Sequence, residues 1–357
     1  MTEPASPAID CSPVRFTADD LPAFPAKFAG VPGAGHLHTA GSHVFGLLPT
    51  AEKPADRAEG GEPAERLEIP AGDGTDDVLA ADLFLPEDAR PGRPLVVVLH
   101  GLGGYAGSPY VTTCAADLLA AGLRVVTLNF RGCGRSHETC RGYLHPGRTG
   151  DVKALLDYLE RDAGRDLYEH GVILLGFSLG GSILLKHLAT ADPADLSRVR
   201  AAVTVSAPLD LAQCSRNLGK AANWAYQRDI LHAMRSYVRQ SPDGVTDEEL
   251  ATAAAASSIW ELDETFTAPR RGFERVEDYY REDSAGWRLP QIEKPTLLIV
   301  ADDDPFVPLE TYDAFDWAAH PHLVQHRTGT GGHAGFFCTE GPLYHSRCVI
   351  ALAELAA

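Results

Sequence analysis

Several features that mark other protein classes are missing from this sequence of 357 residues. No apolar run approaches the roughly 18 residues of a membrane span, and the first ~30 residues lack the basic start and apolar core of a secretory signal. Lysine and arginine total 31 against 49 aspartates and glutamates, and no basic block offsets the net charge of -18. This balance argues against nucleic-acid and anionic-membrane partners. We expect a globular cytoplasmic chain without stable membrane insertion.

The cysteines also lack the patterns of a stabilising framework. No C-x-x-C pair occurs, and their number is odd, so neither a disulfide framework nor a zinc site is indicated. We expect reduced thiols. The seven cysteines are scattered, at positions 11, 114, 133, 140, 214, 338 and 348.

Cofactor motifs are absent as well. There is no G-x-x-x-x-G-K-[ST] loop and no G-x-G-x-x-G after the first expected strand, so nucleotide cofactors are not predicted. The pairs His36/His38 and His320/His322 look like metal ligands but lack a matching carboxylate or cysteine cluster, and we interpret them as surface histidines. The sequence therefore predicts neither a cofactor nor a metal.

Composition divides the chain into two parts. Residues 1–64 are rich in Pro, Ala, Gly and Glu and predict a partly ordered N-terminal extension, with an acidic linker over 51–65. Residues 65–357 predict one folded domain. It opens with two strand-like runs around a Gly/Asp turn between Arg66 and Pro86, which is the pattern of a β-hairpin.

Apolar runs bounded by turn residues follow the hairpin. Most are apolar on both faces, as buried parallel strands are, and the segments between them are long enough for crossover helices. One helix is expected over 149–162, where apolar residues recur at i, i+3, i+4 and i+7 and Thr149 or Asp151 caps the start. The expected strands cover 94–100, 123–130, 171–177, 200–208, 295–301 and 322–328.

Strands that alternate with helices predict an α/β fold with a doubly wound, mostly parallel sheet. A barrel is not expected, because eight regular strand–helix units are not visible. A segment of about 209–293 has helical patterning and several aromatics. Two interpretations are open: an ordinary helical layer, or a helical cap insertion that lines a substrate pocket. We favour the cap, because long insertions commonly carry function.

The stretch VILLGFSLGGSILLKHLA joins an apolar strand to a helix at Ser178. Gly176 and Gly180 flank the serine as G-x-S-x-G, the nucleophile-elbow pattern, in which larger side chains would strike the neighbouring strand and helix. The positive end of the helix favours negative charge that develops beside the hydroxyl. A serine that only caps the helix is the alternative. The strand before, the helix after and the partners downstream favour a nucleophile.

A serine nucleophile needs a histidine base and a carboxylate that orients the histidine. Asp304, in LLIVADDDPFVP, follows an expected strand and is our candidate carboxylate, whereas Asp302 and Asp303 are interpreted as solvated or helix-capping. His333 lies in GTGGHAGFF after the last expected strand, where its imidazole can reach Ser178. The order Ser, Asp, His is that of the α/β-hydrolases.

An oxyanion hole is expected from HGLGG, residues 100–104, which follows an expected strand. The backbone N–H of Leu102 would supply one donor and that of Leu179 the second, an arrangement that suits acyl transfer. His100 itself is interpreted as structural. For Arg131, in NFRGCGRS, substrate contact and an ion pair that fixes the loop are both open, and we favour the ion pair.

Several segments together resemble the YheT-like branch of the α/β-hydrolases, which is related to eukaryotic ABHD-type esterases. They occur in that family's order and span residues 64–350, with GHLHTAGSHVFG a weaker match to its N-terminal segment; at Ser182 the family often has Asn. The segments are HGLGG, NFRGCGRS, LHPGRTGDV, GFSLGGSILLKHLA, VSAPLDLAQCSRNL, FTAPRRGFERVEDYYREDSA, PTLLIVADDDPFVP and GGHAGFF.

The resemblance implies an α/β-hydrolase fold and a charge relay of Ser178, Asp304 and His333. It implies a serine hydrolase of the carboxylesterase type, which cleaves short or medium-chain acyl esters through an acyl-enzyme and needs no cofactor. The implied partner is a small acyl ester. Two alternatives stay open: an acyltransferase that passes the acyl group to an alcohol, and a non-catalytic binding protein that keeps the hydrolase fold.

Overall fold

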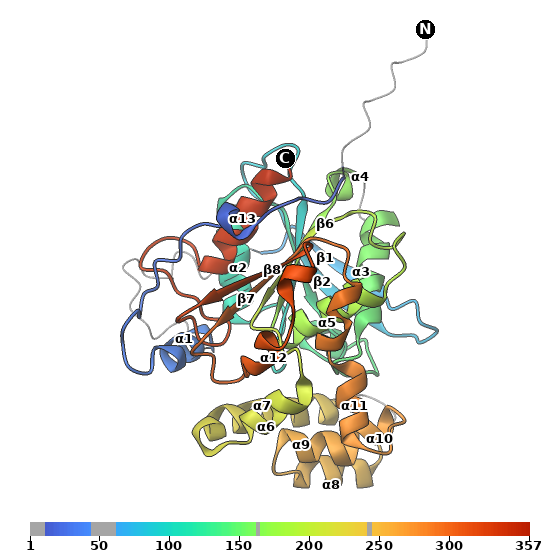
Figure 1. The fold of residues 1–357 in the computed structure, drawn as a ribbon. Coiled ribbons are helices and arrows are strands. Elements are labelled where there is room, and N and C mark those ends of the chain that lie inside the picture. Colours follow the sequence, from blue (N-terminus) through green and yellow to red (C-terminus); the bar gives the residue numbers. More distant parts are fainter. Residues whose placement is uncertain (1–10, 44–61, 162–164, 241–244) are drawn as a thin grey trace.

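The computed structural model describes residues 11–43, 62–161, 165–240 and 245–357 (Figure 1). One eight-stranded sheet forms the centre, in the order β1-β2-β4-β3-β5-β6-β7-β8. Strands β3 to β8 run parallel, whereas β2 is antiparallel to both of its neighbours. The predicted mostly parallel sheet is confirmed. Its strands are β1 (Glu65–Pro70), β2 (Val78–Phe84), β3 (Leu95–Leu99), β4 (Val125–Asn129), β5 (Val172–Phe177), β6 (Val199–Val205), β7 (Thr296–Ala301) and β8 (Leu323–Thr328).

Helices cover both faces of the sheet, so it is doubly wound. Helices α2 and α13 pack on one face, and α3 and α5 pack on the other (Figure 1). Every residue of β3 to β7 is buried, which explains why these strands are apolar on both faces. The helices are α1 (Ala34–His43), α2 (Pro109–Ala120), α3 (Thr149–Arg161), α4 (Arg165–Tyr168), α5 (Leu179–Thr190), α6 (Leu211–Leu218), α7 (Trp224–Gln240), α8 (Asp247–Ala255), α9 (Ile259–Leu262), α10 (Ala268–Arg270), α11 (Val276–Asp283), α12 (Glu310–Asp313) and α13 (Tyr344–Leu355).

Helix α3 is the helix expected over 149–162, and its apolar face is buried in the core. Thr149 is its first residue. Asp151 does not cap the helix, because its buried carboxylate pairs with the guanidinium of Arg131 at 2.7 Å. That part of the sequence prediction was wrong.

The segment between β6 and β7 contains helices α6 to α11, which lie together beyond one end of the sheet (Figure 1). The segment has a small hydrophobic core of its own, to which Leu231, Val238, Leu262 and Phe266 contribute. We call residues 209–293 the cap. It covers the edge of the sheet at which β5 and β7 end.

The described part of the N-terminal segment, residues 11–43, packs against the sheet domain. The N–H of Val14 donates to the carbonyl of Arg200 at 2.8 Å, and Ala26 forms a bridge with Cys338. Residues 1–10 and 44–61 lie outside the described residues, and with them most of the expected acidic linker. The N-terminal segment therefore contributes to the folded body that carries the candidate site.

Candidate active site

Ser178 occupies a sharp turn between β5 and α5. Its φ of 49° is a left-handed backbone conformation, which a non-glycine residue rarely adopts. A Cβ on Gly176 would lie 2.7 Å from the Cα of Gly181, and one on Gly180 would lie 2.3 Å from the carbonyl oxygen of His100. Both flanking positions therefore require glycine. The Ser178 side chain makes no capping hydrogen bond to α5.

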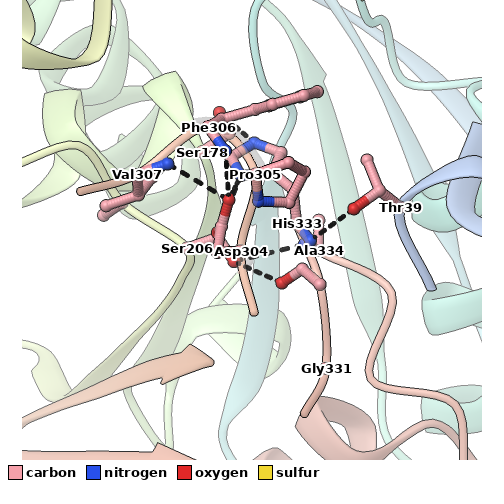
Figure 2. Close-up of polar contacts among 12 residues, drawn as sticks. Thr39, Ser178, Ser206, Asp304, Pro305, Phe306, Val307, Gly331, His333 and Ala334 are labelled. Atoms are coloured by element: carbon pink, nitrogen blue, oxygen red, sulfur yellow. Dashed lines mark hydrogen bonds and ion pairs between the residues drawn. The ribbon is translucent and has the colours of Figure 1, made fainter. Parts of the chain in front are cut away.

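The structure brings Ser178, His333 and Asp304 together from three loops (Figure 2). His333 Nε2 lies 2.8 Å from Ser178 Oγ, and His333 Nδ1 lies 3.0 Å from Asp304 Oδ2. The Asp304 side chain is fully buried, and its Oδ1 also accepts the N–H groups of Phe306 and Val307 at 2.8 and 3.1 Å. These two backbone hydrogen bonds fix the orientation of the carboxylate independently of its contact with the imidazole.

The chain of contacts has the geometry of an activated serine. A carboxylate at Nδ1 holds that nitrogen as the N–H donor, which leaves Nε2 as the acceptor that faces the hydroxyl. The ring of Phe306 packs against the imidazole with centroids 4.3 Å apart. Contacts at both ring nitrogens and with the ring of Phe306 therefore fix the orientation of the imidazole.

The two aspartates before Asp304 have different roles. Asp302 is exposed and pairs with Arg327. Asp303 accepts the N–H groups of Gly331 and Gly332 at 2.9 and 2.8 Å. The expectation that Asp303 is solvated or caps a helix was wrong, because its carboxylate fastens the loop that carries His333.

The loop after β3 lies beside Ser178, because Leu99 and Gly176 are register partners in the parallel pair β3/β5. A Cβ on Gly101 would lie 3.0 Å from the Cβ of Ser178. Within the described residues, no protein acceptor takes the N–H of Leu102 or of Leu179. Leu102 and Leu179 line the same cavity as Ser178, so their amides are candidates to donate to an oxyanion there.

His100 and Arg131 have structural positions. His100 is buried and accepts the N–H of Phe130 at Nε2, and burial lowers its pKa to about 4, so the ring is neutral. Arg131 is buried among Asp73, Asp77 and Asp151 at 2.7 to 3.2 Å. Arg131 does not border the cavity, so the ion-pair interpretation holds.

A cavity of about 290 Å³ extends from Ser178 into the cap. The loops after β3 and β5 form its floor, and cap helices line the other side. Apolar cap side chains form much of the wall, among them Leu211, Leu218, Ile230, Met234, Val238 and Leu262.

A polar cluster interrupts the apolar wall, and the sequence analysis missed two of its members, Ser215 and Asp263. The hydroxyl of Tyr280 donates to Asp263 Oδ2 at 2.7 Å and lies 3.1 Å from Ser215 Oγ. Burial raises the pKa of Asp263 to about 6, against the opposing effect of hydrogen bonds from Tyr280 and Thr267. No motif marks Asp263, because the cap sequence alone does not show which side chains face inward.

The interpretation of His36 and His38 as surface histidines was half wrong. His36 is exposed and stacks on Tyr226, but His38 is fully buried beside the loop of His333. Thr39, also buried, hydrogen-bonds to His333 and was likewise missed. The one sequence feature that pointed to these residues is the weaker match of GHLHTAGSHVFG to the N-terminal segment of the YheT-like family.

In the described ranges, no group of three His, Cys, Asp or Glu side chains could hold a metal ion. Each helix there is too short or too polar to cross a membrane. All seven cysteines are free thiols.

Comparison with known proteins gives consistent matches. A model of the alpha/beta hydrolase fold matches residues 94–243. "Putative esterase YheT" of Escherichia coli is 34% identical over 79% of this chain and 80% of that protein. "Medium-chain fatty acid ethyl ester synthase/esterase 2" of Saccharomyces cerevisiae is 30% identical over 68% of this chain, which spans only 58% of that protein. The solved Pyrococcus furiosus esterase Pf2001 shares the fold, with a TM-score of 0.51 and 17% identity over 79% of this chain and 85% of that chain.

Proposed function

Because this chain belongs to the α/β-hydrolase superfamily, as its resemblance to the YheT-like branch predicted, we propose that it is a serine hydrolase of carboxylic esters. The observation that carries the proposal is the hydrogen-bonded chain from Ser178 through His333 to Asp304, with links of 2.8 and 3.0 Å. Relatives named as esterases support the ester as the substrate class.

Acylation begins when Ser178 Oγ attacks the ester carbonyl carbon and His333 Nε2 takes the hydroxyl proton. The carbonyl oxygen becomes an oxyanion that accepts the N–H groups of Leu102 and Leu179, and Asp304 stabilises the imidazolium. The imidazolium then passes its proton to the leaving alcohol as the carbon–oxygen bond breaks. Ser178 is left as an acyl ester.

Deacylation repeats these steps with water as the nucleophile. His333 Nε2 takes a proton from water, the hydroxide oxygen attacks the acyl carbon, and the proton returns to Ser178 Oγ as the acid leaves. No step uses a cofactor.

The substrate is a small ester with a short or medium acyl chain. A cavity of about 290 Å³ lies at the lower end of the range for small-molecule sites. Its apolar cap wall suits an alkyl chain, because burial of each CH₂ contributes about 0.8 kcal/mol to binding.

Transfer of the acyl group to an alcohol is the second candidate. The yeast relative's name includes an ethyl ester synthase activity, and an alcohol can replace water in deacylation without any other change. Product ratios measured with and without added ethanol separate the two activities: ethyl ester would accumulate for a transferase, and free acid would dominate for a hydrolase.

A fluorophosphonate probe tests the proposal, since it reacts only with an activated serine. We expect the wild type to be labelled and Ser178→Ala to remain unlabelled. Ser182→Ala is the matched control, because Ser182 lies one turn along α5 and bonds to Pro208. An unlabelled wild type would instead support a non-catalytic binding protein. Equal labelling of Ser178→Ala would show that a serine other than Ser178 reacts, and would contradict the proposed nucleophile. Hydrolysis of p-nitrophenyl esters from acetate to palmitate then determines the chain-length preference.

A further inference from the structure

Helix α1 lies directly against the loop that carries His333. The backbone N–H of His333 donates to Thr39 Oγ1 at 2.8 Å, and both residues are buried (Figure 2). The two residues are 294 positions apart in the sequence. The N-terminal segment thus supplies the acceptor for the candidate base's own amide.

The Thr39 hydroxyl is oriented for this role. Its hydrogen is donated to the carbonyl of Gly35 at 2.7 Å, one turn earlier in α1, so a lone pair is left to face His333. A buried amide that loses its acceptor is destabilised, because the lost bond is not replaced by one to water. The bond therefore favours one position of the His333 backbone over neighbouring ones.

A second bond ties α1 to the same loop. The N–H of Phe337 donates to His38 Nδ1 at 3.1 Å. Burial lowers the pKa of His38 to about 4, against the opposing charge of Asp303, so the ring is neutral and Nδ1 can accept. The two bonds thus join α1 to the loop at His333 and at Phe337. Between these residues, Ala334 and Phe336 have positive φ values of 61° and 44°.

Close backbone packing places α1 against both candidate loops. A Cβ on Gly35 would lie 2.0 Å from the carbonyl oxygen of Asp303, next to Asp304. A Cβ on Gly332 would lie 2.3 Å from the carbonyl oxygen of Gly35, and one on Gly335 would lie 2.3 Å from that of His38. Only glycine permits these contacts, so the fit between helix and loop is tight.

The remaining anchors of the loop bind other atoms. Ser206 Oγ accepts the N–H of Ala334 at 3.2 Å, and Asp303 binds the amides before His333. Strained conformations such as that of Ala334 persist only where surrounding contacts fix them. The backbone N–H of His333 has Thr39 Oγ1 as its acceptor.

We propose that Thr39 is a positioning residue for His333, and that α1 is a built-in part of the active site. The inference rests on the proposed function for its effect on turnover. Thr39 is not among the residues that line the cavity. Its hydrogen bond fixes the position of the His333 backbone. The position of this backbone in turn determines the distance from Nε2 to Ser178 Oγ.

The test compares Thr39→Val with Thr39→Ser. Valine keeps the shape but removes the acceptor, whereas serine keeps the acceptor. We expect Thr39→Val to lower kcat for p-nitrophenyl butyrate by ~10- to 100-fold with KM within about twofold of wild type, because small displacements of a base cost this much. The rate of fluorophosphonate labelling should fall in parallel. Thr39→Ser should restore both.

Thermal unfolding shows whether the variants are folded, and Thr39→Ala replaces the valine variant if that one is not. A folded acceptor-free variant with wild-type kcat overturns the proposal. So does a serine variant that is as impaired as the valine variant.

A readout independent of turnover separates this inference from the proposed function. The His333 Nδ1–H bonded to Asp304 should give a downfield proton NMR signal, identified by its absence in His333→Gln. If the wild type does not react with the probe, the proposed function fails, but the signal still reports the position of the imidazole. Thr39→Val should shift or broaden the signal, and Thr39→Ser should keep it. An unchanged signal in Thr39→Val overturns the positioning role.

Discussion

Asp304 holds His333 through a carboxylate that is itself held by the backbone. Its Oδ2 lies 3.0 Å from His333 Nδ1, while its Oδ1 accepts the N–H groups of Phe306 and Val307. The carboxylate therefore cannot turn away from the imidazole without losing two backbone bonds. This arrangement selects the tautomer that leaves Nε2 open toward Ser178.

Replacement of Asp304 by Asn tests that selection. The amide NH₂ can donate to Nδ1, which would place the imidazole proton on Nε2 and block the base. We expect kcat to fall by about 10⁴-fold, as loss of the orienting carboxylate does in serine hydrolases. Steady-state hydrolysis of p-nitrophenyl butyrate is the measurement. Asp302→Asn is the control, since Asp302 is exposed and pairs with Arg327; a comparable loss in that variant would contradict the assignment of Asp304.

The strands and the turn at Ser178 could be predicted because their causes are local. Each strand from β3 to β7 is buried along its whole length, so its sequence is apolar on both faces. The glycines around Ser178 are required by contacts within the turn and with the adjoining strand end. Asp304 could be chosen over Asp302 and Asp303 because it lies three residues past Ala301, where α/β-hydrolases commonly carry the carboxylate.

Contacts between distant segments could not be predicted. Thr39 meets His333 only because the N-terminal segment folds back over the sheet domain, and no periodicity in residues 34–43 indicates this. Asp151 reads as a helix cap from its position, but the buried guanidinium of Arg131 takes its carboxylate. Asp263 is one of many cap acids, and its burial depends on how the cap helices pack. In each case the contact depends on how distant segments pack together, which the local sequence pattern does not show.

The ion pairs of Arg131 predict a large effect on stability. Arg131→Met would leave the buried carboxylates of Asp77 and Asp151 without their cation, and breaking such a cluster costs about 3–5 kcal/mol. Urea unfolding followed by circular dichroism measures the loss. Arg131→Lys keeps the charge and should lose less. A loss below about 1 kcal/mol in Arg131→Met would mean that the cluster resembles a surface ion pair.

The cap wall predicts chain-length selection. Met234 lies on α7 and borders the cavity, so Met234→Trp should fill part of the space for the acyl chain. We expect kcat/KM for p-nitrophenyl octanoate to fall at least about tenfold more than for the acetate, because overpacking an apolar site costs about 1–3 kcal/mol. Met234→Leu, of similar volume, should leave the ratio unchanged. Equal losses for both esters would place the acyl chain elsewhere.

Because two buried histidines have lowered pKa values, we expect the free energy of unfolding to fall in mild acid. Burial lowers the pKa of His100 to about 4 and that of His345 to about 3, from an ordinary value of 6.5. Below pH ~6.5 the unfolded chain therefore binds protons that the folded chain does not, so stability is present above that pH and is lost as the pH falls. Asp263 has the opposite effect: burial raises its pKa to about 6, so its contribution weakens as the pH rises from 3.8 to that value.

His345 isolates one such contribution. Its ring packs against Phe177, and neither ring nitrogen has a hydrogen-bond partner among the described residues, so protonation would leave an unpaired charge in the core. His345→Phe removes this titration and keeps an aromatic ring. Between about pH 7.5 and 4.5, the unfolding free energy of the wild type should fall by about 2–3 kcal/mol more than that of the variant, at roughly 1.4 kcal/mol per pH unit below 6.5. Urea unfolding at several pH values measures both slopes. Parallel slopes would show that His345 takes up its proton in the folded state, which requires a water or acceptor at its ring.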